Sequence, residues 1–142
     1  MALLLARVAE ERDGIASEPP VDLEQRTAQF ARSAAAAHVA VAGSAIIGTI
    51  HVEAGRFGAG DVGMLVDGDW RGRGVGTALL DAAIARSREQ GLHKLCLEVF
   101  ATNTAAIALY RRCGFVEEGL RAQQYRRASG ELWDAVVMGL LL

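Results

Sequence analysis

The sequence of 142 residues has few of the residues that restrain a chain covalently or restrict its backbone. It contains two cysteines and two prolines, and its single lysine stands against 14 arginines. Cys96 and Cys113 lack the Cys-x-x-Cys spacing, so neither a zinc site nor a redox motif is indicated. No apolar run approaches the ~20 residues of a transmembrane helix, and the run at the start is too short for a signal peptide. These absences predict a cytoplasmic protein that does not bind membranes.

The charge is nearly balanced overall but unevenly distributed along the chain. A net charge of -2 excludes binding to nucleic acid through bulk basicity. Residues 1–70 hold five arginines and ten acidic residues, a net of -5, whereas residues 71–142 hold ten basic and seven acidic residues, a net of +3. An anionic ligand is therefore expected in the second half. The length and the 51% of apolar residues predict one domain over residues 1–142 with an ordinary core.

Hydrophobic periodicity divides the chain into helices and short strands. Helices are expected over 2–13, from the cap Asp22 onward with Leu23 and Phe30 buried, over 74–90, and from Asn103 through Cys113. Strands are expected over 39–41, 46–52, 62–66, 95–99, 115–118 and 133–140. Gly43-Ser44 would turn the first hairpin, residues 34–37 would fray or connect, and residues 120–131 would form a polar connection. This order predicts a mixed α/β sheet.

A glycine-rich turn between the strand ending at Val66 and the following helix is the most informative segment. It reads Arg71-Gly72-Arg73-Gly74-Val75-Gly76-Thr77. Free N–H groups at a helix start, glycines that permit close approach and two arginines favour a phosphate or pyrophosphate site. The alternative is that Gly74 and Gly76 only allow close helix–sheet packing. A Walker A loop is excluded because no lysine is present here.

A dinucleotide-binding fold is a second interpretation of the same turn. Glu98 lies 22 residues after Gly76, near the position where such folds place an acidic residue. However, about half the chain precedes the turn, and too few strand–helix–strand units follow it.

The spacing Arg71-x-x-Gly74-x-Gly76 resembles the acetyl-CoA motif of the GNAT family of N-acetyltransferases. The resemblance covers residues 38–142, is strongest over 62–119, and includes Asn103, Leu109-Tyr110 and Gly114-Phe115. The run 97–110 is similar to bacterial ribosomal-protein alanine N-acetyltransferases. The resemblance implies a mostly antiparallel twisted sheet with a splayed parallel strand pair, flanked by helices. Family members usually open with a strand, so that edge strand is expected to be missing or very short here.

The resemblance also implies where acetyl-CoA, the expected cosubstrate, would bind. Its pantetheine arm would lie in the splayed gap and pair with the main chain at Leu65 and Val66. The pyrophosphate would rest on the N–H groups of the turn: Arg71, Gly72, Arg73, Gly74, Val75, Gly76 and Thr77. Asn103 would contact the cofactor arm, although asparagine is also an ordinary helix cap. Arg111 or Arg112 would face the 3′-phosphate, and no metal is implied.

Two residues are the implied catalytic groups for transfer to a primary amine. Tyr110 would be the general acid toward the leaving thiolate, and Glu98 the general base toward the attacking ammonium. An unpaired carboxylate is costly to bury, so Glu98 is expected in an open cleft. Other candidate bases are Asp61, His51 and Glu53, and Tyr110 could instead be a plain core residue.

The acceptor side is less defined by the sequence. In the family, the region 120–131 helps form the acceptor site, and Arg121, Arg126 and Arg127 would suit an acidic acceptor or simply be solvated. The acceptor is a small-molecule amine or a protein N-terminus. A non-catalytic acyl-CoA binding module is the alternative function, and exposed sheet edges with the apolar end 136–142 make a homodimer plausible.

Overall fold

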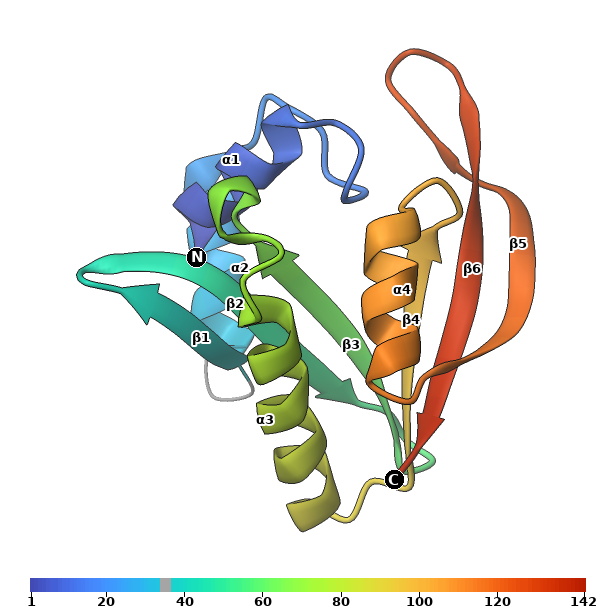
Figure 1. Ribbon diagram of the computed structural model, residues 1–142. Helices are drawn as coiled ribbons and strands as arrows, with labels where there is room; N and C mark the ends of the chain where they lie inside the picture. The colour runs from blue at the N-terminus through green and yellow to red at the C-terminus, as the bar shows by residue number, and fades with distance from the viewer. Residues whose placement is uncertain (34–36) are drawn as a thin grey trace.

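The computed structural model describes residues 1–33 and 37–142, the side chains of residues 32 and 33 excepted (Figure 1). The helices are α1 (Ala2–Glu10), α2 (Leu23–Ser33), the 3₁₀ helix η2 (Gly68–Trp70), α3 (Val75–Glu89) and α4 (Thr104–Arg112). The strands are β1 (Ala37–Ala42), β2 (Ala45–Ala54), β3 (Ala59–Val66), β4 (Lys94–Phe100), β5 (Val116–Arg126) and β6 (Leu132–Leu141). The expected frayed or connecting residues 34–36 lie outside the described part, and Ala37 begins β1.

The strands form one sheet in the order β1-β2-β3-β4-β6-β5, and β3–β4 is its parallel pair. The predicted mixed sheet with mostly antiparallel pairing is therefore confirmed. The parallel pair is short, because only Ala59–Asp61 pairs with Lys94–Cys96. Beyond those residues β3 and β4 diverge toward their carboxyl ends, and Figure 1 shows the resulting V. The splay that the family resemblance implied is present.

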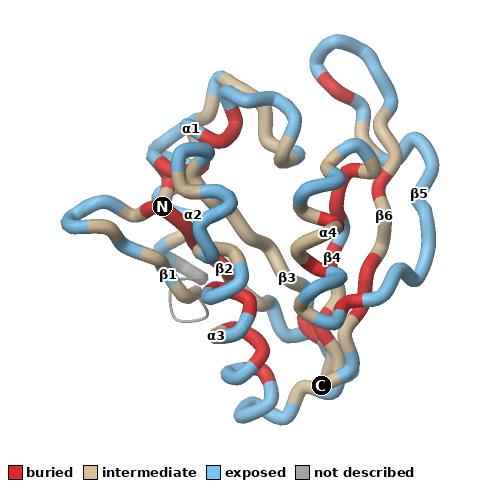
Figure 2. The backbone as a smooth tube through the Cα atoms, viewed as in Figure 1, coloured by how far each residue is buried: buried red, intermediate tan, exposed pale blue. Residues whose placement is uncertain are grey.

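A single buried cluster joins α3 and α4 to one face of the sheet. Leu95, Leu97 and Val99 of β4 alternate toward the helices, where they meet Leu80 of α3 and Tyr110 of α4. Figure 2 shows buried residues along α3, α4, β4 and β6, whereas β5 is exposed along nearly its whole length. The core thus fixes α3 on one arm of the V and α4 on the other.

Three sequence expectations were wrong in detail. Helix α1 ends at Glu10 instead of residue 13, and Arg12 takes a positive φ of 61°. Helix α2 packs mainly on α1, so its expected core residue Leu23 stays 42% exposed. Strand β5 continues to Arg126, through the segment predicted to be a polar connection. An edge strand exposed on both faces is held by backbone pairing and needs no apolar alternation, so its sequence gave no strand signal.

None of the helices in the described ranges is both long and apolar enough to cross a membrane.

Candidate functional site

The glycine turn ends in an open helix N-terminus at the mouth of the V. Gly72 and Gly74 have φ of 70° and 85°, and Gly74 is the left-handed N-cap of α3. A glycine cap offers no side-chain oxygen, and the first hydrogen bond of the helix runs from Ala78 N to Gly74 O at 3.0 Å. The N–H groups of Val75, Gly76 and Thr77 precede that bond and point along the helix start. This arrangement has the donors and the dipole end that an anion requires.

Gly76 has a packing role in addition. A Cβ at this position would lie 2.8 Å from Leu109 Cδ2 and 3.7 Å from Met64 Cε. An alanine at this position would require the end of the Leu109 side chain on α4 to shift, whereas its contact with Met64 of β3 would be an ordinary one. The tight contact of Gly76 is with α4, and a Cβ at Gly74 would meet no atom within 4 Å, so close helix–sheet packing does not account for either glycine.

The two arginines of the turn already have partners within the chain. Arg71 Nε donates to Val66 O at 3.2 Å, and its Nη2 lies 2.5 Å from Glu11 Oε2. Arg71 thus ties the turn to the end of β3 and to the residue after α1. Arg73 lies over the ring of Trp70 at 5.4 Å. The family resemblance implied that Arg71 and Val66 each contact the cofactor. The fold shows in addition that Arg71 donates a hydrogen bond to the Val66 carbonyl.

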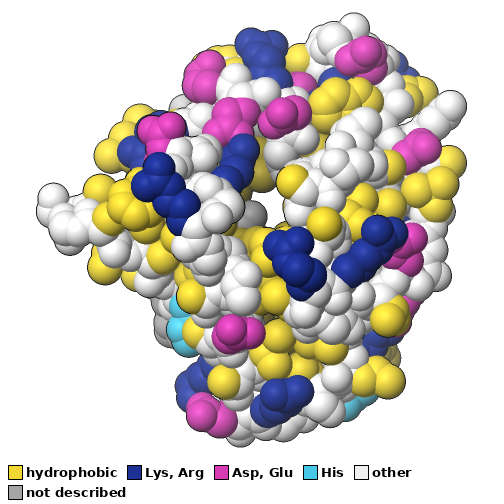
Figure 3. All heavy atoms as spheres, viewed as in Figure 1, with side chains coloured by type: hydrophobic (Ala, Val, Ile, Leu, Met, Phe, Trp, Pro, Cys, Tyr) yellow, Lys and Arg dark blue, Asp and Glu magenta, His cyan; other side chains and the backbone are white. Residues whose placement is uncertain are grey.

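On the other arm, Asn103 caps α4. Its Oδ1 accepts a hydrogen bond from Ala106 N at 3.1 Å, so the helix-cap interpretation is confirmed. Arg111 forms an ion pair with Glu117, whereas Arg112 has no hydrogen bond or ion pair within the described residues. Figure 3 shows a hollow between the N-terminal end of α3 and α4, with basic side chains on both sides. Of the two arginines on α4, Arg112 is the one left available for an anion.

Tyr110 lies in the helix-side core, next to the V. It is 8% exposed, and its ring meets Phe115 edge-on with centroids 5.8 Å apart. Burial raises the pKa of its phenol from 10.0 to about 12. The hydroxyl is protonated at physiological pH, as a general acid must be, and its burial makes it a weaker acid than a free phenol.

This raised pKa gives a measurable stability effect. Relative to Tyr110→Phe, the wild-type protein should lose about 1 kcal/mol of unfolding free energy between pH 8 and pH 11. The unfolded phenol ionises near pH 10, before the folded one at about 12, so the stabilisation is complete below pH 10 and is lost as the pH rises through 12. Urea unfolding at both pH values measures the difference, and equal losses in the two proteins would contradict the burial.

Glu98 lies on the opposite face of β4, because Leu97 and Val99 beside it point to the core. Its Oε1 is 2.6 Å from Arg121 Nη1, and its Oε2 accepts a hydrogen bond from the Tyr125 hydroxyl at 3.2 Å. Glu98 is solvent-accessible, as expected, with 27% of its side chain exposed, and two side chains of β5 also bind its carboxylate. Burial and the nearby Glu98 charge raise the pKa of Tyr125, which keeps that hydroxyl a donor.

Sequence reasoning missed Arg121 and Tyr125 as partners of Glu98. Both β4 and β5 pair with β6, so Glu98 and Tyr125, 27 positions apart in the sequence, lie on the two sides of one strand. The alternation of β5 alone could not show this, because its side chains are nearly all exposed. The available signal was the grouping of arginines and a tyrosine in 120–131.

Arg127, expected to be solvated, is the most enclosed charged side chain of the described residues, 3% exposed. Its Nε lies 2.8 Å from Glu18 Oε1, and its terminal nitrogens donate to carbonyl oxygens of Arg12, Ile15 and Ala16 at 2.9–3.3 Å. The guanidinium also lies over the rings of Trp133 (4.6 Å) and Phe100 (5.2 Å). Arg127 therefore fastens the segment 12–18 to the end of the β5–β6 hairpin.

Two of the other candidate bases, Asp61 and Glu53, lie at the closed end of the V. Asp61 is opposite Cys96, where β3 and β4 still pair, and Glu53 is opposite Asp61 on β2. The His51 ring covers Gly63. Glu98 lies two residues beyond Cys96, where β3 and β4 have diverged, so the register favours Glu98 over Asp61 and Glu53.

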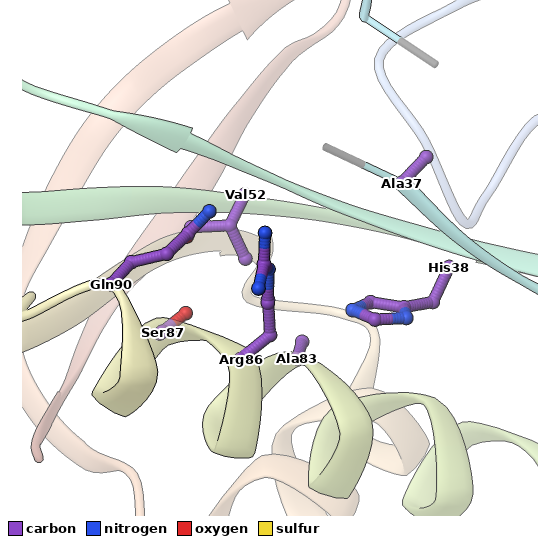
Figure 4. A pocket seen from close by; sticks show the side chains of 7 residues that line it. All are labelled: Ala37, His38, Val52, Ala83, Arg86, Ser87 and Gln90. Atoms are coloured by element: carbon purple, nitrogen blue, oxygen red, sulfur yellow. The ribbon is translucent and has the colours of Figure 1, made fainter. Parts of the chain in front are cut away.

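Two cavities lie along α3 and β1, away from Tyr110 and Glu98. A hollow of about 540 Å³ runs between β1 and the first half of α3, and Arg73 and Gly74 line one end. Figure 4 shows the smaller cavity, about 40 Å³, which His38, Arg86, Ser87 and Gln90 line, and the Ser87 hydroxyl is buried without a hydrogen-bond partner among the described residues. That volume is enough for a water molecule. Within the described residues, no group of three or more His, Cys, Asp or Glu could hold a metal ion.

Comparison with known proteins gives a family and several relatives. Residues 5–115 match the model of the acetyltransferase (GNAT) family. An L-methionine sulfoximine/L-methionine sulfone acetyltransferase of Pseudomonas aeruginosa is 38% identical over 135 residues, which cover 89% of this chain and 78% of that protein. An Escherichia coli [ribosomal protein bS18]-alanine N-acetyltransferase is 43% identical over 75 residues, 53% of this chain.

The alignment with the latter protein spans only half of its length. Among solved structures, a ribosomal-protein-alanine N-acetyltransferase from Brucella melitensis superposes with a TM-score of 0.87 at 29% identity. The superposition covers 99% of this chain and 93% of that one. The similarity therefore reaches the whole fold, including α1, α2 and the β5–β6 hairpin.

Proposed function

Since the chain belongs to the acetyltransferase (GNAT) family, we propose that it transfers the acetyl group of acetyl-CoA to a primary amine. The observation that carries the proposal is the V between β3 and β4, with an open helix N-terminus at its mouth. The helix N-terminus suits a pyrophosphate, and the gap between the strands suits a slender arm reaching through the sheet. No other part of the described chain combines the two features.

The residues of the V divide the binding of acetyl-CoA between them. The N–H groups of residues 71–77 would hold the pyrophosphate, and Arg112 would face the 3′-phosphate. The main chain at Leu65 and Val66 would pair with the pantetheine arm, which requires Arg71 to share or release Val66 O. Asn103 would reach the arm with its amide nitrogen while its Oδ1 caps α4.

Tyr110 and Glu98 would act from opposite faces of β4. Glu98 takes a proton from the acceptor ammonium, and the neutral amine attacks the thioester carbonyl carbon. Attack forms the new C–N bond and a tetrahedral oxyanion, which collapses as the C–S bond breaks and Tyr110 donates its proton to the departing sulfur. The nitrogen then releases its remaining extra proton to water, and the Tyr110 phenolate takes up a proton from water. A backbone N–H of the diverging end of β3 would stabilise the oxyanion. Acetyl-CoA would enter from the helix side, and the acceptor from the side of β5.

The acceptor we propose is the amine of a small amino-acid-like molecule. The Pseudomonas relative, named for methionine derivatives, aligns with 89% of this chain and so includes the acceptor side. The E. coli relative, named for a protein N-terminal alanine, aligns with 53%. A protein N-terminal amine is the second candidate, supported by the whole-chain likeness to the Brucella structure.

Two measurements test the proposal together. Acetyl-CoA at 100 times its Kd should add about 2.7 kcal/mol to the unfolding free energy, and NAD should add nothing. CoA release should then depend on an added amine, measured over amino acids, polyamines and N-terminal peptides. Stabilisation by acetyl-CoA without turnover on any amine would instead support a non-catalytic binding module. Stabilisation by NAD alone would refute the CoA site.

A further inference from the structure

The proposed base is held in a charge pair that an incoming amine has to open. Glu98 Oε1 is 2.6 Å from Arg121 Nη1, and Glu98 Oε2 accepts from Tyr125. Within the described residues, no other cation lies within ion-pair distance of Glu98. An acceptor ammonium that approaches this carboxylate competes with a guanidinium that is already there.

The backbone of β5 is built to bring both partners to this one carboxylate. Arg121 lies opposite Ala135 and Tyr125 opposite Trp133, so four residue steps on β5 match two on β6. The surplus residues form a bulge, in which Gln123 has a φ of 53° and its N–H donates to Asp134 Oδ1 at 2.7 Å. A regular strand would place Arg121 and Tyr125 about 13 Å apart along its axis. The bulge shortens that span, and bulges of this kind commonly re-aim side chains beside active sites.

We propose that Arg121 is a specificity-determining residue that binds a carboxylate of the acceptor, and that the acceptor is therefore an α-amino acid. This inference rests on the proposed function, in which Glu98 is the base. A zwitterion exchanges partners without leaving a charge unpaired: its ammonium takes Glu98, and its carboxylate takes Arg121. A simple amine would displace Arg121 from Glu98 and leave the guanidinium without a carboxylate partner.

Arg121 is suited to this exchange, and its neighbour Arg127 is not. The Arg121 side chain is 51% exposed and is bound through one terminal nitrogen, so a second carboxylate can reach its planar fork. Arg127 is buried and fully committed to Glu18 and three carbonyls. Arg126 is exposed and has no hydrogen bond or ion pair within the described residues, which makes it a matched control.

The same exchange distinguishes the two candidate acceptors. A protein N-terminus has an amide where a free amino acid has its carboxylate, so it offers Arg121 no anion at that position. We therefore expect free α-amino acids to be acetylated in preference to their carboxamides and to N-terminal peptides.

The test compares L-amino acids, methionine sulfone and alanine among them, with their carboxamides in an assay of CoA release. Wild-type protein should show kcat/KM at least tenfold higher for the best amino acid than for its carboxamide. Arg121→Gln should lower kcat/KM for the acid about a hundredfold, mainly through KM, and change that for the carboxamide less than threefold. Arg121→Lys should recover part of the lost kcat/KM for the acid. Arg126→Gln should leave kcat/KM unchanged for both substrates.

The possible failures are distinguishable. If Arg121→Gln lowers kcat/KM equally for the amino acid and for its carboxamide, Arg121 does not bind the carboxylate. If wild-type protein acetylates carboxamides or peptides as well as acids, the α-amino acid assignment is wrong although the transferase activity stands. If no amine supports CoA release while acetyl-CoA still binds, the proposed function fails and this inference fails with it.

Discussion

Tyr110→Phe should lower kcat for amine-dependent CoA release about a hundredfold and leave the affinity for acetyl-CoA unchanged. The variant loses the proton that the leaving thiolate requires, and general acid catalysis typically contributes 10²- to 10⁴-fold. The ring itself stays in place, because its burial and its edge contact with Phe115 do not involve the hydroxyl. Steady-state kinetics with a saturating acceptor measure the effect.

Two controls separate catalysis from folding in this experiment. The stabilisation of Tyr110→Phe by acetyl-CoA should equal that of the wild type within about 0.5 kcal/mol, which shows that the cleft is intact. The Phe57→Leu variant alters an aromatic residue that is 89% exposed in the connection between β2 and β3, and it should retain its activity. Unchanged CoA release in Tyr110→Phe would remove the general-acid assignment and leave Tyr110 as a core residue.

Arg127→Met should lower the free energy of unfolding by about 3 kcal/mol, the low end for breaking a buried ion pair. The low end applies because Glu18 keeps 20% of its side chain exposed and can be partly rehydrated. Methionine retains the apolar contact with Phe100 and Trp133 but loses the ion pair and the three carbonyl hydrogen bonds. Urea unfolding followed by tryptophan fluorescence measures the change.

Arg126→Met is the matched control for Arg127→Met. The two arginines are adjacent in the sequence, but Arg126 is exposed, so its replacement should change the unfolding free energy by less than about 0.5 kcal/mol. Hydrogen exchange should also speed up in residues 12–18 of Arg127→Met, since that segment loses its attachment. If the two variants unfold with equal free energy, the contacts of Arg127 with residues 12–18 contribute nothing measurable to stability.

The sequence by itself determined the elements that local rules govern. Helix α3 begins at Val75, one residue after the expected start at Gly74, Asn103 caps α4, and the first hairpin turns at Gly43, which has a φ of 58°. Turn and cap residues act through their own backbone or through residues three or four positions away, so their effect can be predicted from the sequence alone. The glycine turn, the strand before it and the helix after it were predicted on that basis.

Only the tertiary structure decided which side chains meet. Glu98 is joined to Arg121 and Tyr125 because β6 lies between β4 and β5, and Arg127 is buried because residues 12–18 fold over the hairpin more than 100 positions away. In the sequence, Arg121, Tyr125, Arg126 and Arg127 all belong to one polar segment, and nothing in their order indicates that Arg127 is buried. Pairing across a sheet depends on strand order and bulges, which no local pattern encodes, and these long-range contacts form the surface where we propose that the acceptor binds.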